Sequence, residues 1–287
     1  MRRRISVIAA VAAMAVVITA CGSSSGPSSS DTNGDATTTT VAGTGAYASL
    51  ASMTGKTIGV QSDTTGETYA NEHKPAGAKV KDFAGTDELF AALASNQIQG
   101  ILQDLPINAY RTTKDKTTVV VETYKTNEQY GFVVKKGNAG LLGALNTGLG
   151  KARSDGTYDS LFQKYFNRKP EGATPTPTPA GSDPVKTVKS GTLTMCSDIP
   201  YAPMEFEGDG PSGYTGFDVE LMNAIAKAND LELAVIDVDF DGILGNLAAG
   251  KCDVVGSSVT ITDERKKEAD FTDPYFDADQ SLLVKTK

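Results

Sequence analysis

Hydrophobic and polar positions along the chain follow two rhythms, one with the period of strands and one with the period of helices. Short β-branched runs predict strands, and segments such as 86–100, where Leu89 and Leu93 share one face, predict amphipathic helices. The two kinds of segment alternate, which is typical of mostly parallel sheets covered by helices on both sides. The expected strands are 56–61, 78–83, 100–104, 117–124, 129–136, 192–198, 231–239, 252–258 and 279–287, and the expected helices are 62–73, 86–100, 105–113, 141–166 with a break near 154–156, 216–230, 240–251 and 262–271.

Residues 1–21 depart from this rhythm and predict an export signal peptide. Three arginines precede a run of small apolar residues that is too short to span a membrane. The run ends in Ala20, Cys21 and Gly22, which resembles the lipobox of bacterial lipoproteins and implies cleavage before Cys21 with a lipid anchor on that cysteine. The alternative is an ordinary secretory signal that ends near a cysteine. We therefore expect the protein outside the cytoplasm, anchored by lipid to the outer face of the cell membrane.

Two further segments lack the apolar residues that a core requires. Residues 22–46, rich in Ser, Thr and Gly, predict a flexible tether. Residues 170–186 alternate Pro with Thr and predict an extended linker. The α/β rhythm restarts after this linker, so the chain contains two folded stretches.

Charge and residue types exclude several kinds of function. The formal net charge is −8, and loss of the three signal arginines brings it to −11, so the acidic body argues against a nucleic-acid partner. The single histidine, His73, is remote in sequence from Cys196 and Cys252, and no CxxC pair occurs, so we expect neither a metal site nor a cofactor. A disulfide between the two cysteines stays open, because export favours it while the expected strand alignment sets them at different heights.

Ordered motifs carry a resemblance to a known family. They are "GKTIGVQSDTTGETYA", "QGILQDLPINAYR", "YGFVVKKGN", "ARSDGTYDSLFQKYF", "SDIPYAPMEF", "GYTGFDVELMNAIAK" and "DFDGILGNLAAGKCDVVGSSVTITDERKKEADFTDPY". They resemble the polar amino-acid-binding proteins of ABC importers, the family 3 solute-binding proteins with the type II periplasmic-binding fold. The resemblance implies an α/β protein of two lobes, each a mostly parallel sheet flanked by helices, with a ligand cleft between the lobes.

The order of these motifs differs from the order in the family, where the block beginning "GTLTMCSD" comes first. The swap resembles a circular permutation, which leaves lobe 2 at 47–130 and lobe 1 at 131–169 and 187–287, with the linker 170–186 inside lobe 1. Two chain crossings normally join the lobes in this family. We expect the swap to leave one covalent crossing and a looser hinge.

A site for a free amino acid needs a cation for the carboxylate, an anion for the ammonium and a shaped wall for the side chain. By resemblance Arg265 binds the carboxylate, helped by Thr260 and by Thr65 of the other lobe, and the alternative for Arg265 is a solvated helix residue. Asp104 ends a strand and is expected to bind the ammonium with the Ser258 main chain, its alternative role being the N-cap of the next helix. The remaining implied ligand contacts are Gln61, Thr64, Asp198, Tyr201, Phe240 and Ser257, with Gln103 as a further polar group of lobe 2.

Asp198 is the residue that predicts which ligand is bound. The family uses this position for a cationic or amide side-chain tip, and an acidic ligand would be repelled there. We expect arginine first, then glutamine, lysine or histidine. Asp63 replaces a glycine that is usual in the family, and we expect it to cap the following helix. The alternative is that it faces the cleft, where it would weaken carboxylate binding by Thr65 and add to the preference for cations.

The resemblance implies a monomeric binding protein and not an enzyme. It captures a free amino acid by lobe closure and is read by the transmembrane subunits of an ABC permease. One alternative is a dehydratase-like enzyme that acts on a cyclic carboxylate, because fold does not settle function. Another is a ligand-sensing docking protein.

Overall fold

The computed structural model describes residues 38–40, 45–170 and 183–287. The expected signal peptide with Cys21, most of the expected tether and most of the linker lie outside the described residues. Residues Ala36–Lys287 form one compact unit. Among the described helices, none combines the length and the apolar character needed to cross a bilayer.

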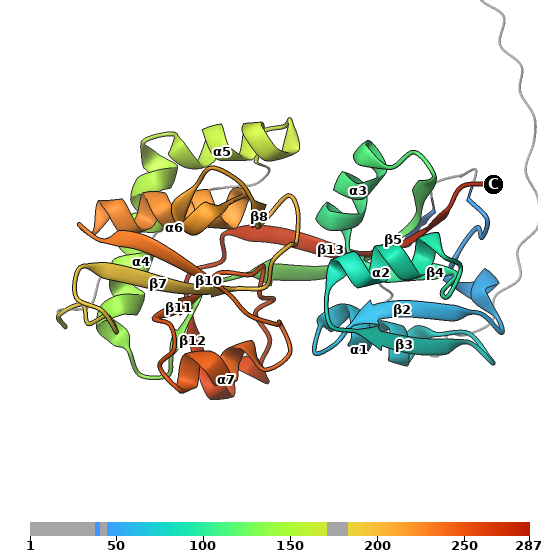
Figure 1. Cartoon of the computed structure of the whole chain (residues 1–287), viewed down its shortest axis with the longest axis horizontal. Coiled ribbons are helices and arrows are strands. Elements are labelled where there is room, and N and C mark those ends of the chain that lie inside the picture. Colours follow the sequence, from blue (N-terminus) through green and yellow to red (C-terminus); the bar gives the residue numbers. More distant parts are fainter. Residues whose placement is uncertain (1–37, 41–44, 171–182) are drawn as a thin grey trace, which may run out of the picture. The chain divides into compact units, whose positions relative to one another are not determined.

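Lobe 2 is built on a six-stranded sheet with the strand order β1-β5-β13-β4-β2-β3 (Figure 1). Strand β2 pairs in parallel with β3 and β4, while β13 pairs antiparallel with both β4 and β5. The apolar positions of 56–61 and 86–100 form its core, where Ile58, Val60, Leu89 and Leu93 are fully buried. The elements are β1 (Thr38–Thr40), η1 (Leu50–Met53), β2 (Thr57–Gln61), α1 (Thr65–His73), β3 (Lys79–Phe83), α2 (Thr86–Ala94), β4 (Gly100–Asp104), α3 (Leu105–Lys114), β5 (Thr118–Tyr130) and β13 (Phe276–Lys285).

Lobe 1 is built on a five-stranded sheet with the order β10-β7-β11-β6-β12. Strand β7 pairs in parallel with β10 and β11, and β6 pairs antiparallel with β11 and β12. Both sheets are therefore mixed, which corrects the expectation of mostly parallel sheets. The elements are β6 (Val133–Lys135), α4 (Ala139–Ser154), α5 (Thr157–Phe166), β7 (Thr192–Ser197), β8 (Phe206–Glu207), η2 (Pro211–Gly213), β9 (Tyr214–Thr215), α6 (Phe217–Ala228), β10 (Glu232–Asp237), α7 (Ile243–Ala248), β11 (Val254–Val255), α8 (Arg265–Glu268) and β12 (Ala269–Phe271).

Two long antiparallel strands, β5 and β13, join the lobes and run side by side in Figure 1. Strand β13 begins at Phe276, which packs in the core of lobe 1, and continues to Gln280–Val284, which pair with β4 of lobe 2. The expectation of one covalent crossing is therefore wrong, as is the assignment of all of 187–287 to lobe 1. The chain ends only after β13 has entered the sheet of lobe 2, so both crossings are retained and the reason for a looser hinge disappears.

Aromatic side chains from both sides of the linker share the core of lobe 1. Phe162 and Phe166 of α5 pack against Phe217 of α6, with ring centroids 5.7 and 5.3 Å apart. Phe276 lies 5.5 Å from the Phe162 ring. Such ring contacts add to the stability that burial of the rings already provides. The stretches before and after the linker thus fold into one lobe.

A disulfide links Cys196 of β7 to Cys252, with their Cα atoms 5.7 Å apart. The sequence had argued against this disulfide because Cys252 was expected on a strand beside β7. Val255 pairs with Cys196, so on a continuous strand Cys252 would lie three residues further along from Cys196. Strand β11 begins only at Val254, and Cys252 lies in the turn before it. The turn brings the two Cα atoms within the usual range for disulfides, roughly 4.4–6.8 Å.

The segment expected to be a tether contains structure at its end. Thr38–Thr40 form β1, which pairs antiparallel with Glu122–Tyr124 of β5. Gly45 forms a bridge with Thr286, and the Ala46 N–H donates to the carbonyl of Lys285 at 2.7 Å. The two ends of the folded unit are therefore hydrogen-bonded to each other.

Candidate functional site

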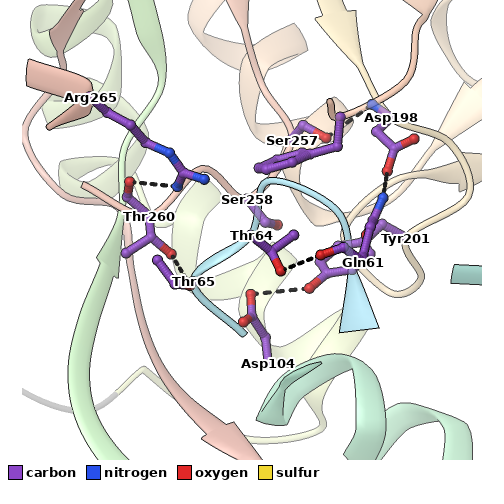
Figure 2. A pocket seen from close by; sticks show the side chains of 11 residues that line it. Gln61, Thr64, Thr65, Asp104, Asp198, Tyr201, Ser257, Ser258, Thr260 and Arg265 are labelled. Atoms are coloured by element: carbon purple, nitrogen blue, oxygen red, sulfur yellow. Dashed lines mark hydrogen bonds between the residues drawn. The ribbon is translucent and has the colours of Figure 1, made fainter. Parts of the chain in front are cut away.

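The eleven ligand residues expected from the sequence line one pocket, with contributions from both lobes (Figure 2). Lobe 2 supplies Gln61, Thr64, Thr65 and Asp104, and lobe 1 supplies Asp198, Tyr201, Phe240, Ser257, Ser258, Thr260 and Arg265. Gln103, expected as an additional group, is buried elsewhere and donates from Nε2 to Asn108 Oδ1 at 3.0 Å. It is not among the lining residues.

The turns after strands place these side chains. Gln61 and Asp104 end β2 and β4, and Asp198 follows directly after β7. The carboxyl ends of strands are where ligands sit in open α/β sheets. The N-cap of α1 is Thr64, whose Oγ1 accepts from the Glu67 N–H at 3.1 Å, so the cap expected at Asp63 lies one residue further on.

Arg265 begins α8, and its guanidinium reaches from lobe 1 to lobe 2. Nη1 donates to the carbonyl of Thr260 at 3.0 Å, and Nη2 donates to the carbonyl of Asp63 at 2.8 Å. The guanidinium carbon lies 5.4 Å from the centre of the Phe240 ring. Burial lowers the pKa of Arg265, and it forms no ion pair with a carboxylate of the described residues. The cation is held by neutral carbonyls and keeps donors for an anion.

Asp104 faces the pocket from β4. It occupies the N-cap position of α3, but its side chain makes no cap hydrogen bond to that helix. Its Oδ2 accepts from the hydroxyls of Tyr130 and Tyr201, and its Oδ1 accepts from Gln280 Nε2. Burial, and next the charge of Glu128, raise the pKa of Asp104 to about 6 against the opposing effect of these hydrogen bonds. The carboxylate is therefore a buried anion without a cationic partner in direct contact in the described chain.

Asp198 lies at the other end of the pocket. Gln61 Nε2 of lobe 2 donates to its Oδ2 at 2.6 Å, and its own N–H donates to Ser257 Oγ at 2.9 Å. Burial raises the pKa of Asp198 to about 6, and the charges of Asp237 and Asp239 act in the same direction. A cationic or amide group would find a desolvated acceptor here.

Two buried carboxyl groups beneath the pocket were missed by the sequence reasoning. Ser257 Oγ donates to Glu205 Oε1 at 2.9 Å, and Asp218 Oδ2 accepts from the Ser258 N–H at 2.8 Å and from the Tyr275 hydroxyl at 2.5 Å. Burial raises the pKa of Asp218 to about 7, and burial with the charge of Asp218 raises that of Glu205 well above its usual value. These two carboxyl groups hold Ser257 and Ser258 in position through hydrogen bonds. Asp218 lies on the apolar face of α6, and a carboxyl group at such a position is the sequence signal that could have identified it.

A polar network on the crossing strands was also missed. Glu128 of β5 accepts from the hydroxyls of Thr65 and Thr260, and Gln280 of β13 donates to Glu128, Thr65 and Asp104. Gln280 is fully buried. No local pattern marks these two residues, because only the pairing of β5 with β13 brings them to the pocket.

The groups around the pocket contact one another across it. The cavity they leave measures about 20 Å³, which is roughly the space for one water molecule. A ligand larger than a water molecule therefore requires the two lobes to separate. Among the described residues, no group of His, Cys, Asp and Glu has the geometry of a metal site.

Comparison with known proteins places the chain in a family. The sequence profile of the bacterial extracellular solute-binding proteins, family 3, matches residues 40–168 and 193–287. The chain belongs to this family. Its members are binding proteins, so the expectation of a solute-binding protein and not an enzyme is confirmed at the level of the family.

Individual relatives match in part. A probable histidine-binding protein of Campylobacter jejuni is 40% identical over 96 residues, which are 33% of this chain and 36% of that protein. The arginine-binding extracellular protein ArtP of Bacillus subtilis is 40% identical over 94 residues, 32% of this chain and 36% of that protein. The chain thus spans about a third of the length of these relatives. A ligand-binding component of an ABC-type import system from Staphylococcus aureus is 9% identical, with a TM-score of 0.44, over 80% of this chain and 66% of that one.

Proposed function

We propose that this protein captures a polar L-amino acid outside the cytoplasm and delivers it to an ABC importer. The observation that carries the proposal is the placement of Arg265 and Asp104, one from each lobe, around a single pocket. A guanidinium fork matches a carboxylate with two parallel hydrogen bonds, and a buried carboxylate matches an ammonium. An α-amino acid presents both groups on one carbon, so such a ligand can bridge the two lobes at this point.

The ligand class follows from Asp198 at the far end of the pocket. Its buried carboxylate, with Gln61 beside it, favours a cationic or amide side chain and repels an acidic one. Tyr201 and Phe240 supply apolar walls for the stem of that side chain. We infer arginine first, then glutamine, lysine or histidine. The relatives named as histidine- and arginine-binding proteins fall within this set.

The mechanism is a two-lobe trap that turns on β5 and β13. Opening breaks the contacts that now cross the pocket, including those from Arg265 to Asp63 and from Gln61 to Asp198. An amino acid that enters then replaces them with charge-assisted hydrogen bonds to both lobes, which favours closure. The permease subunits recognise the closed, loaded form.

Calorimetric titration with each of the twenty amino acids, on protein lacking residues 1–21, tests the proposal. We expect one or a few basic or amide amino acids to bind with one-to-one stoichiometry. Failure of all twenty to bind would overturn the proposed function. Binding of acidic amino acids alone would leave an amino-acid-binding protein but contradict the role given to Asp198.

Acidification is expected to act oppositely on folding and on binding. The pKa values of Asp104 and Asp198 are raised to about 6, so the folded state takes up these protons before the unfolded state does. Without ligand, the contribution of these groups to the free energy of unfolding therefore rises as pH falls from 7 towards 4. Binding needs ionised Asp104, so affinity should fall about tenfold per pH unit below 6 for each required carboxylate. Titrations between pH 8 and 5 check this, and constant affinity across that range would contradict it.

We propose that the chain order is a circular permutation of the family order. In support, the ends at Gly45 and Thr286 form a β-bridge, and α5 and α6 share one core. A rearranged chain in which 187–287 is joined through a short linker to 45–169 should fold and bind the same amino acid within a few-fold. Loss of folding in that chain would count against the proposal.

We further propose that Cys21 carries a lipid anchor, on the strength of its lipobox-like surroundings. A Cys21→Ser variant produced in a bacterial host should then be released from the membrane. Equal release of both forms from the membrane would argue for an ordinary secretory signal.

A further inference from the structure

Glu128 holds two hydroxyl groups of the pocket at once. It lies on β5, near the point where the strand leaves lobe 2. Its Oε2 accepts from Thr65 Oγ1 at 2.6 Å and from Thr260 Oγ1 at 2.9 Å, and its Oε1 accepts from Gln280 Nε2 at 3.1 Å. Thr65 belongs to lobe 2 and Thr260 to lobe 1, so one carboxylate bridges the lobes.

The hydroxyls of Thr65 and Thr260 each donate their single proton to Glu128 and cannot donate a second hydrogen bond. A threonine hydroxyl carries one proton and two acceptor lone pairs. The protons of Thr65 and Thr260 both point to Glu128, and Gln280 donates to the oxygen of Thr65. Neither hydroxyl can therefore donate to the carboxylate of an amino acid until Glu128 releases it. Hydrogen bonds to an ionised acceptor are the stronger kind, so this release has a cost.

Glu128 also lies in the positive field of Arg265, the residue proposed to bind the ligand carboxylate. Glu128 and Arg265 interact electrostatically, although they form no direct ion pair in the described chain. A ligand carboxylate bound to Arg265 and the two threonines would lie next to the Glu128 carboxylate, and like charges at that separation repel. The two carboxylates compete for one set of donors.

We propose that Glu128 is an internal stand-in for the α-carboxylate of the ligand. It occupies the hydroxyl donors on both lobes, links the lobes through them, and must be displaced when an amino acid binds. Glu128 thereby lowers the affinity for every ligand that has an α-carboxylate. The inference rests on the proposed function and adds a residue that sets ligand affinity from outside the pocket lining.

The test compares Glu128→Ala and Glu128→Gln with the unaltered protein by calorimetry, using L-arginine and L-argininamide, which lacks the carboxylate. We expect Glu128→Ala to bind arginine about tenfold more tightly and Glu128→Gln about threefold more tightly, with no gain for argininamide. Asp277→Asn is the matched control. Asp277 is an exposed carboxylate on β13 that contacts Gln129 and neither threonine, so its removal changes the charge equally and should leave both affinities unchanged.

Several outcomes overturn this role. Weaker binding of both arginine and argininamide by the Glu128 variants would make Glu128 an anchor for the cationic groups of the ligand. Equal gains for both compounds would mean that Glu128 acts only by linking the lobes through Thr65 and Thr260, and not by competing with the ligand carboxylate. Should Glu128→Ala fail to fold, Glu128→Gln decides alone. If the unaltered protein binds another amino acid in place of arginine, that amino acid and its amide serve as probes. If it binds none, the proposed function itself has failed and this inference with it.

Discussion

Replacement of Arg265 by alanine is expected to weaken amino-acid binding by at least about 100-fold, or about 2.7 kcal/mol. The guanidinium is the one cation among the residues that line the pocket. Its loss would leave the ligand carboxylate buried with hydroxyl and N–H donors alone, and truncation of one partner of a buried, hydrogen-bonded charge pair typically costs about 2–5 kcal/mol. Calorimetric titration with the amino acid identified for the unaltered protein measures the effect.

Two further variants separate the roles of charge and geometry at this position. Arg265→Lys keeps the charge but not the planar fork, so its affinity should fall between those of the alanine variant and the original protein. Lys267→Ala removes an exposed cation of the same helix, α8, and should bind normally. If Arg265→Ala bound within a few-fold of the original, the carboxylate would have to be held elsewhere.

Removal of the disulfide is expected to lower the free energy of unfolding by about 2–4 kcal/mol. The bond closes a loop with a sequence separation of 56 residues, and cross-links across loops of this size restrict the unfolded chain by about that amount. For a folded unit of this size we expect the melting temperature to fall by roughly 4–16 °C. Thermal and denaturant unfolding of a Cys196→Ala/Cys252→Ala variant, without residues 1–21, checks this.

Reduced protein with both cysteines present is the control for that experiment. Cys196 and Cys252 are both buried, so the alanine variant also loses packing of two sulfur atoms. The reduced protein loses the cross-link alone, and it should account for most of the drop. An unchanged melting temperature on reduction would mean that the loop is already restricted in the unfolded chain.

The residues that line the pocket were expected because each one lies in a motif that resembles the family. Arg265 lies in "SSVTITDER", and Asp104 and Asp198 end apolar strands, so the resemblance assigns them without knowledge of their neighbours in space. Glu128 and Gln280 were not predictable in this way. Their role depends on the register of β5 against β13. Glu128 and Gln280 are 152 residues apart in the sequence, and only this strand pairing brings them together. The mixed sheets and the retained second crossing were missed for the same reason.

The disulfide shows a different limit of sequence reasoning. Whether Cys252 lay on a strand or in a turn decided its distance from Cys196, and strand ends are the least certain feature of a hydrophobic pattern. Glu205 and Asp218 show a third limit of sequence reasoning. A carboxyl group on an apolar face signals burial, but its hydrogen-bond partners, Ser257 and Ser258, come from a turn that is distant in sequence.

Strand β1 has a practical meaning for anyone who shortens the protein. An uncovered strand edge invites pairing with another chain and so promotes aggregation. Thr38–Thr40 cover Glu122–Tyr124 at the outer edge of the six-stranded sheet, beside the long strand on which the lobes turn. Truncation at residue 21 or 36 keeps this cover, whereas truncation at residue 46, where the folded lobe was expected to begin, exposes the edge of β5. We therefore expect the segment that reads as a simple spacer to protect the sheet from self-association.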